Sequence, residues 1–319
     1  MSLAILFKSK WKVLAPILGV AALVLVFWSV NDRFLSYPNF LNILRQSSVL
    51  LIVATGLTFV ILLGSIDLSV GTIVTLSALV TAVAIRDYGA GLGGAVLVAS
   101  GIGLFCGAIN GALVVFARIP SLVATLGTMT ALGGMAIWVS GGRNVIFRDE
   151  WMRWLSSGKL FFGIPNVALW AILLFAVAAF VGSKTHLGRA IFVVGAGSKA
   201  ASLSGFNVVR TKFYAFLICG FLSGLAGLMM VARTSAGTPR MGDDLMLDAI
   251  AAVVIGGTAL SGGSGGVHRT IIGVLIITLI SNGLNVIGVH PYLQIAISGL
   301  LVIGAVALIL DRGRLMFVK

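Results

Sequence analysis

GRAIFVVGAGSKAASLSGFNVVRTKF, from Gly188 to Phe213, is the stretch of sequence from which the architecture of the whole chain can be interpreted. It lies in the longest charged gap between apolar runs, and it carries Arg189, Lys199, Arg210 and Lys212 but no acidic residue. Its centre is made of small residues. The pattern predicts a short polar helix held against a membrane between two spans, which is typical of a docking surface for another protein.

The composition on either side of this stretch is that of a membrane protein. The chain has 319 residues, of which 59% are hydrophobic and 10% charged, whereas a soluble domain carries about a quarter charged residues. Its apolar runs are long enough to cross a hydrocarbon core about 30 Å thick. Backbone groups inside a membrane must be satisfied within the segment, so we expect helices. The sequence predicts an all-α polytopic membrane protein that forms a single transmembrane domain, 1–319.

We expect ten membrane-spanning helices. They are predicted at residues 13–30, 47–64, 69–85, 93–116, 122–140, 163–182, 213–232, 247–262, 270–288 and 292–310. The eighth is the weakest, because the apolar run Ala249–Leu260 is short and leads into SGGSGG, so a broken or re-entrant helix is the alternative there. The N-terminal apolar run resembles a signal peptide, but no small-residue cleavage site follows it, and we interpret it as a retained first span.

The charges in the loops predict the orientation. With ten spans, the side that holds both termini carries thirteen basic residues and two acids, and the other side carries nine basic residues and seven acids. The loop 183–212 alone has five basic residues and no acid. Basic residues favour the cytoplasmic side, so we place both termini and this loop in the cytoplasm and the chain in the cell (inner) membrane, in contact with its lipid.

Several other classes of protein are excluded by the sequence. The net charge of +13 is divided among short loops, as orientation signals are, so nucleic acid is not expected as a partner. Cys106 and Cys219 fall inside predicted spans without metal-ligand spacing. The three histidines, His186, His268 and His290, lie in separate loops. We therefore expect no metal site, no catalytic residues and no enzymatic activity in this chain.

A faint internal repeat predicts where a solute would pass. NGALVVFARIPSLVATLG at Asn110–Gly127 resembles NGLNVIGVHPYLQIAISG at Asn282–Gly299, and the matched spans are five apart, so the two copies would have opposite orientations. Such inverted repeats are common in transporters, with the substrate path at their interface. The polar candidates for the path are Asn110, Ser121, Thr125, Thr128, Asn282 and Gln294. The alternative is that these hydroxyls bond to their own helices.

Two glycine-rich segments imitate nucleotide-binding motifs. Ala190–Leu203 contains Gly-x-Gly-x-x-Ala, but a dinucleotide site needs an acid about 20 residues further on, and none occurs between Glu150 and Asp243. Gly262–Gly266 lacks the lysine of a phosphate-binding loop. We therefore expect no cofactor in this chain. The first segment is better interpreted as a helix that begins with Ser198 as its N-cap, and it either docks a partner or simply lies on the membrane.

Asp67, Ser69 and Asp248 have an uncertain role. Asp67, in LLGSIDLSVG at Leu62–Gly71, lies almost without a loop between two spans, where an acid is costly and often functional. Capping of the next helix by Asp67 or Ser69 is the interpretation we favour. In MGDDLMLDAI at Met241–Ile250, three carboxylates within six residues could bind a cation or a basic partner, and Asp248 is expected in the first turn of a helix.

Three separated motifs together resemble a known family. GLTFVILLGSIDLSVGTIVTLSA, HLGRAIFVVGAGSKAASLSGFNVVRTKFYAFLICGFLSGLAGLM and LDAIAAVVIGGTALSGGSGG are similar to the membrane permease subunit of ribose-type sugar ATP-binding-cassette (ABC) importers, and the resemblance covers nearly the whole chain after about residue 35. It implies a ten-span, inverted-repeat permease that pairs as a homodimer or heterodimer. It also implies a cytoplasmic ATPase that binds ATP-Mg, and a periplasmic or extracellular binding protein that delivers a monosaccharide or related solute.

The resemblance also implies a coupling segment that packs into a groove on the ATPase. Its residues would be Gly197, Ser198, Ala200, Ala201, Leu203, Ser204, Gly205 and Asn207. The chain departs from the family pattern elsewhere: Met246 stands where relatives have Glu, Ser264 where they have Arg, and His268-Arg269 where they have small or apolar residues. These departures leave the class unchanged and the solute open, whether pentose, hexose, polyol or a signalling sugar.

We therefore expect alternating access driven by a partner ATPase through the Ser198–Asn207 helix. The rival is an ion-coupled secondary carrier of a small polar solute, which needs charged relays inside the membrane. Asp67 and Asp248 are the only acids that come near such a position.

Overall fold

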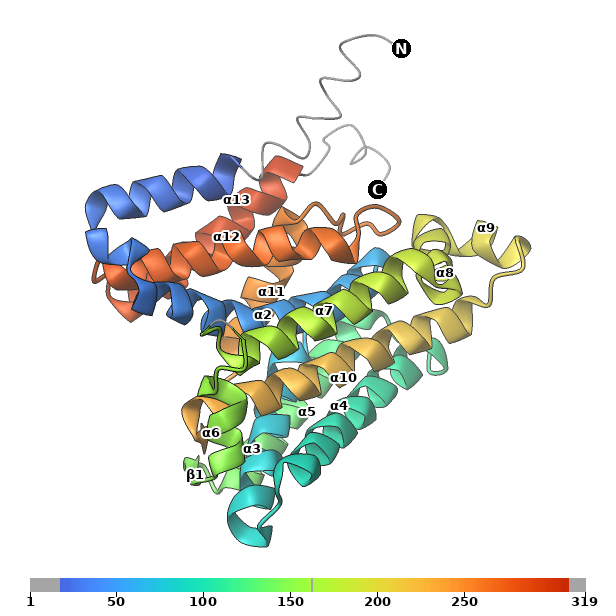
Figure 1. The fold of residues 1–319 in the computed structure, drawn as a ribbon. Helices are drawn as coiled ribbons and strands as arrows, with labels where there is room; N and C mark the ends of the chain where they lie inside the picture. Colours follow the sequence, from blue (N-terminus) through green and yellow to red (C-terminus); the bar gives the residue numbers. More distant parts are fainter. Residues whose placement is uncertain (1–17, 162, 310–319) are drawn as a thin grey trace.

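The computed structural model describes residues 18–161 and 163–309, and its regular structure is almost entirely helical (Figure 1). A first helix covers Leu18–Val30. The elements that follow are η1 (Asp32–Leu35), α2 (Tyr37–Leu62), α3 (Val70–Tyr88), α4 (Leu92–Val115), α5 (Ser121–Ser140), β1 (Val145–Ile146), α6 (Glu150–Ser157), α7 (Asn166–Lys184), α8 (His186–Ala196), α9 (Ser198–Leu203), α10 (Val208–Thr234), β2 (Ala236–Gly237), α11 (Asp243–Ile255), α12 (Val267–Val286) and α13 (Pro291–Ile309).

Seven helices in the described ranges are long and apolar enough to cross a membrane. They are α2, α3, α4, α5, α7, α10 and α12. Each overlaps one of the predicted spans, so the class of polytopic helical membrane protein is confirmed. The eighth predicted span was wrong at its end, because α11 stops at Ile255 and residues 256–266 form a glycine-rich loop. The predicted start at residue 13 and the predicted end at residue 310 lie outside the described residues.

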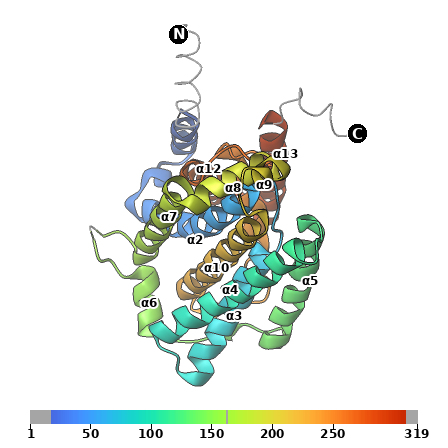
Figure 2. The ribbon, with the colours of Figure 1, turned by 90° about the vertical axis from the view of Figure 1, so that its right-hand side faces the viewer.

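Helices α2 and α10 occupy the centre of the molecule (Figures 1 and 2), and α3 is largely buried beside them. Helix α10 packs against α2, α3 and α4, while α2 also packs against α7 and α12. In the most apolar 18-residue segment of each helix, 78% of the residues of α2 and of α10 are buried, but only 22% of those of α5. Helix α5 therefore rests on α3 and leaves most of its surface available to lipid or to another protein.

The contact between α4 and α10 is made by glycines. Gly103 and Gly107 on α4 face Gly220 and Gly224 on α10, and a Cβ atom added to Gly107 would lie 3.1 Å from the Cα of Gly220. Small residues spaced four apart let two helix backbones approach closely, and this is a common way to pack helices in a membrane. These glycines therefore allow α4 and α10 to pack with their backbones in direct contact.

One end of the bundle is defined by α8 and α9, at the right of Figure 1. There the amide of Gly263 donates a hydrogen bond of 2.9 Å to the carbonyl of Leu62 at the end of α2. Gly195 on α8 packs against the same carbonyl, with no space for a side chain. At the opposite end β1 pairs with β2, with Val145 opposite Gly237. We call these the α8–α9 end and the β1–β2 end.

The connection between α10 and α11 runs back alongside α3. Gly237 packs against Leu79, and the amide of Gly242 donates a hydrogen bond of 3.0 Å to the hydroxyl of Thr75. Helix α11 therefore begins beside the first turn of α3. It has 13 residues, or about 20 Å of helix, which is shorter than the hydrocarbon core of a bilayer. The weak eighth span is thus a short helix preceded by irregular backbone.

Candidate functional site

Two helices separated by a single residue form the predicted docking surface. Helix α8 ends at Ala196, Gly197 is in an extended conformation, and α9 begins at once with Ser198. The prediction that Ser198 is the N-cap was wrong. Because the chain leaves α8 only at Gly197, that glycine is the N-cap, and the Ser198 hydroxyl is directed back to the Val194 carbonyl over 3.4 Å.

Most of the predicted coupling residues are exposed in α9 and the turn after it. The exposed members are Ser198, Ala200, Leu203, Ser204, Gly205 and Asn207. Leu203 is 85% exposed, whereas Ala201 is buried under the helix. Gly205 has a positive φ of 84°, and the Asn207 side chain accepts a hydrogen bond from the Arg210 amide and so caps α10. These residues form one compact projection at the α8–α9 end.

The base of this projection is anchored in the helical core. Ala190, Ile191 and Val194 of α8 are buried, and the rings of His186 and Phe206 lie 5.9 Å apart. Together with the contact of Gly195 at the end of α2, this packing ties α8 to the bundle. Any displacement of α8 must therefore disturb the end of α2 and the loop at residue 263.

Four polar side chains meet inside the protein, two from the connection that leads into α3 and one each from α4 and α5. We call Asp67, Ser69, Asn110 and Thr128 the Asp67 cluster. The Asn110 amide donates to the Ser69 hydroxyl over 2.7 Å and approaches the Asp67 carboxylate at 3.4 Å. The Thr128 hydroxyl donates to the Asn110 carbonyl oxygen over 2.7 Å. Asp67, Ser69 and Asn110 are fully buried, so this network joins α3, α4 and α5 away from solvent.

Two further hydroxyls of α5 hold the connection between α2 and α3. The Leu68 amide donates to Thr125 over 3.1 Å, and the Ile66 amide donates to Ser121 over 3.2 Å. Irregular backbone inside a membrane protein needs such partners, because no water is there to replace them. The predicted path residues Asn110, Ser121, Thr125 and Thr128 are therefore brought together, but as a clamp on residues 66–69. Their role in transport stays a prediction.

Asp67 does not cap α3 in the expected way. Its carboxylate accepts hydrogen bonds from both the amide and the hydroxyl of Ser69, and Ser69 occupies the N-cap position without a side-chain bond to the helix. Burial raises the pKa of the Asp67 carboxyl above its ordinary value, and the bonds from Ser69 and Asn110 oppose that rise. Among the described residues the single ion pair joins Arg86 and Asp87, so Asp67 is held by neutral donors.

The remaining candidates lie elsewhere. The Asn282 and Asn39 side chains exchange two hydrogen bonds of 2.9 and 3.0 Å, which fasten α12 to α2. The Gln294 side chain donates to the Val289 carbonyl over 2.7 Å.

Asp248 was wrongly expected in a first helical turn, because α11 already begins at Asp243. Within residues 18–161 and 163–309, no three acidic, histidine or cysteine side chains are placed to hold a metal ion.

Comparison with known proteins identifies the family. Residues 39–306 match the model of a family described as "Branched-chain amino acid transport system / permease component". This match spans the central helices, the Asp67 cluster and the α8–α9 projection. The chain belongs to this permease family. It is therefore a multi-pass membrane component of a transport system, as the motifs predicted.

Curated relatives of this permease are similar over almost their full length. The chain is 38% identical to the ribose import permease protein RbsC of Bacillus subtilis (strain 168), over 96% of this chain and 94% of the relative. It is 39% identical to RbsC of Haemophilus influenzae, over 91% and 90% of the two chains. It is 34% identical to the D-allose transport system permease protein AlsC of Escherichia coli (strain K12), over 95% and 93%. No solved structure matches this permease.

Sequence reasoning did not bring together the residues that line a polar recess between α3, α5 and the segment that leads into α11. Asp243 was considered only as one of three carboxylates that could bind a cation or a basic partner, and nothing in MGDD predicts that the chain returns along α3. The signal that could have found them is the run of small and turn-forming residues Ser235–Pro239, which favours irregular backbone between two apolar runs.

Proposed function

We propose that this permease is the membrane subunit of a binding-protein-dependent ABC importer of monosaccharides. The near-full-length similarity to permeases named for ribose and allose import is the observation that carries the substrate class. The whole chain, 1–319, would act as one transmembrane domain without a cofactor of its own. ATP-Mg would be bound by a partner ATPase.

The ATPase partner would dock on the α8–α9 projection. Leu203 supports this, because a large apolar side chain that is 85% exposed on a six-residue helix is suited to insertion into a groove on another protein. The neighbouring residues are small, so the partner's surface can approach the helix backbone. The basic residues Lys199, Arg210 and Lys212 would meet an acidic rim.

The α8–α9 end would then face the cytoplasm. Five basic residues without an acid in 183–212 favour that side, and both termini would lie there if ten spans are present. The ten would comprise the seven long helices, the helix Leu18–Val30, α11 and α13. In that arrangement α4 and α5 correspond to α12 and α13 in opposite orientation. A sugar-binding protein would dock at the β1–β2 end.

A second permease copy would complete the translocation path. Helix α5 is the candidate contact, because the large apolar side chains of Leu122, Leu126 and Trp138 are all exposed on it. The second copy could be identical to the first or a related chain.

The mechanism would be alternating access driven from the α8–α9 end. ATP-dependent closure of the motor would displace α8, and the contact of Gly195 with the Leu62 carbonyl would pass that displacement to α2. The clamp of Ser121 and Thr125 on residues 66–69 would pass it on to α5. A motor with different affinities for the two arrangements is sufficient to shift their populations.

Reconstitution tests this proposal directly. Proteoliposomes that contain the permease, its ATPase and its binding protein should take up D-ribose or D-allose when ATP is supplied on the ATPase side. The permease alone should take up neither. Sugar uptake by the permease alone, driven by a proton or sodium gradient, would contradict the proposal and support the ion-coupled carrier.

A further inference from the structure

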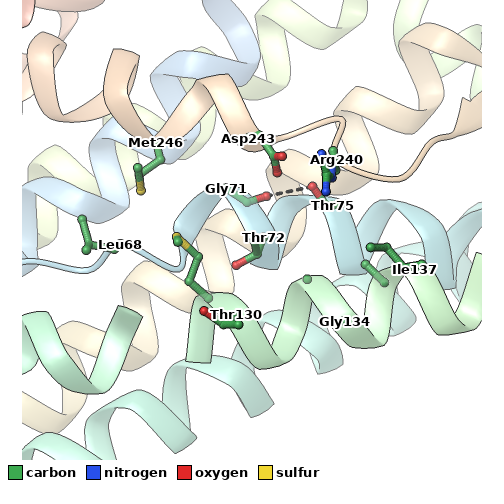
Figure 3. Close-up of a pocket in the computed structure, with 13 residues that line it drawn as sticks. Leu68, Gly71, Thr72, Thr75, Thr130, Gly134, Ile137, Arg240, Asp243 and Met246 are labelled. Atoms are coloured by element: carbon green, nitrogen blue, oxygen red, sulfur yellow. Dashed lines mark hydrogen bonds between the residues drawn. The ribbon is translucent and has the colours of Figure 1, made fainter. Parts of the chain in front are cut away.

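A cavity lies between α3, α5 and the segment that leads into α11 (Figure 3). Its volume is about 400 Å³, within the range of roughly 300–1,000 Å³ typical of small-molecule sites. Figure 3 shows Thr130 and Gly134 on α5 across from Arg240 and Asp243, with Thr72 of α3 between them. The cavity is distinct from the Asp67 cluster, whose side chains do not line it.

The cavity presents charged groups of both signs that are not paired with each other. Arg240 and Asp243 are both exposed in it, and neither takes part in an ion pair within the described parts of the chain. The Thr72 hydroxyl donates to the Ser69 carbonyl over 2.8 Å, so its lone pairs remain able to accept a hydrogen bond. The site thus offers donors from a guanidinium, acceptors from a carboxylate and one further acceptor.

The apolar part of the lining is equally suited to a small ring. Leu68, Ile137 and Met246 contribute aliphatic surface, and Gly134, where an added Cβ would meet no atom within 4 Å, leaves space beside it. A monosaccharide has hydroxyls at its rim and C–H groups on its faces, so it needs this combination of polar groups and aliphatic surface. A solute with one net charge would meet a group of like charge in Arg240 or Asp243.

The backbone that carries Arg240 is built for this position. Arg240 has a φ of 67°, which is uncommon for a residue other than glycine, and the segment is held by the bond from the Gly242 amide to Thr75. Unusual backbone conformations often mark binding sites. In transporters, irregular backbone between short helices is found where it lines the solute site.

We propose that this cavity binds the transported solute, an uncharged polyhydroxylated molecule of monosaccharide size. Arg240 donates hydrogen bonds to its hydroxyl oxygens, and Asp243 and Thr72 accept bonds from its hydroxyl groups. The inference rests on the proposed function and adds a location and a set of contacts within one permease copy. A zwitterionic amino acid would use the same two charged groups differently, with its carboxylate on Arg240 and its ammonium on Asp243.

The first experiment fills the cavity. Gly134→Leu places a side chain where an added Cβ meets no atom within 4 Å, so the helix tolerates it while the cavity is occupied. Gly101→Leu on α4 is the matched control, because an added Cβ there also meets no atom within 4 Å and Gly101 does not line the cavity. In the reconstituted complex with its ATPase and binding protein, Gly134→Leu should abolish D-ribose uptake and Gly101→Leu should retain it.

The second experiment measures the polar contacts. Asp243→Ala and Arg240→Ala should each reduce the D-ribose uptake rate at limiting sugar by about tenfold, as expected for loss of a hydrogen bond to a charged group. Asp243→Asn, which can still accept a hydrogen bond, should restore most of the rate for D-ribose. An amino-acid substrate such as leucine would not be rescued, because its ammonium group requires the charge.

The third experiment reports occupancy without transport. Both native cysteines are buried, so a Gly134→Cys variant offers a water-soluble thiol reagent one accessible target among the described residues. D-ribose should slow labelling of Cys introduced at this position in the complete complex, and labelling that is unchanged at saturating D-ribose would overturn the assignment.

The outcomes separate this inference from the proposed function. If the wild-type complex imports D-ribose or D-allose while Gly134→Leu, Asp243→Ala and Arg240→Ala behave as wild type, the cavity assignment is overturned and the proposed function stands. If the wild-type complex imports leucine and neither sugar, both are overturned.

Discussion

The side-chain amide of Asn110 on α4 donates a hydrogen bond of 2.7 Å to the Ser69 hydroxyl at the start of α3. The carbonyl oxygen of the same amide accepts a bond from Thr128 on α5, so one fully buried side chain joins three helices. Polar groups in the interior are costly when they lose a partner, and this makes Asn110 a sensitive position.

Replacing Asn110 by leucine should destabilise the protein by about 2–3 kcal/mol, because the Ser69 and Thr128 hydroxyls lose their shared partner. Thermal unfolding of the detergent-purified protein, followed by size-exclusion chromatography, measures the effect. Ser140→Ala is the control, since the Ser140 hydroxyl bonds only to carbonyls of its own helix in this structure. Equal stability of the two variants would show that the Asp67 cluster does not hold the helices together.

Asp67→Asn should be tolerated, and Asp67→Leu should not. Asparagine can still accept the bonds from the Ser69 amide and hydroxyl, and it removes a buried carboxyl whose pKa burial has raised. Leucine leaves both donors without a partner. The measurement is sugar uptake by the complete complex between pH 6 and 8. A loss of transport in Asp67→Asn, with a changed pH profile, would instead indicate that Asp67 carries protons.

Gly103→Leu should prevent the folded protein from accumulating, and Gly101→Leu should not. A side chain on Gly103 meets the backbone of Gly220 and Gly224, whereas one on Gly101 meets nothing within 4 Å. The two positions are two residues apart in the same helix, so helix propensity and hydrophobicity are matched. The yield of monodisperse protein in detergent measures the difference. Normal yield from Gly103→Leu would mean that α4 and α10 are not in backbone contact.

Leu203→Asp should weaken binding of the ATPase by about thirtyfold, as expected for loss of a central apolar contact of about 2 kcal/mol. Tyr88→Asp at the end of α3 is the control, because Tyr88 is 83% exposed and Leu203 85% exposed. Co-purification of the ATPase with each variant checks this. Folding should be unaffected in both, and undiminished co-purification with Leu203→Asp would remove α9 from the interface.

The sequence allowed the long helices to be predicted because each is a continuous apolar run. It did not predict α8, since Ala190–Val194 (AIFVV) has the composition of a strand, and only packing of Ile191 and Val194 on the core selects the helix. Nor did it predict the early start of α2, where Ser36 caps a helix whose first turns are polar. Local propensity is a weak guide where tertiary contacts decide.

Some features of the candidate site could also be predicted from the sequence, and others could not. Asn110, Ser121, Thr125 and Thr128 were identified as polar residues at or near the interface of the predicted repeat, and the structure brings them together. Their partners could not be predicted, because residues 66–69 are irregular and meet α5 only in the folded chain. Arg240 and Thr72 are 168 positions apart in the sequence, and they line the same cavity because the chain returns along α3. No periodic pattern in the sequence predicts that return.

Leu203 also bears on the fate of permease chains that are made in excess. If an ATPase docks on α9 as proposed, a chain inserted without it would keep this leucine exposed on a helix of six residues, in which Ala201 is the one buried side chain. Such a weakly held apolar segment opens at small cost and is an easy starting point for cellular proteases. Balanced synthesis of the subunits would therefore protect the permease, and recombinant expression should give the highest yield when the genes are expressed together.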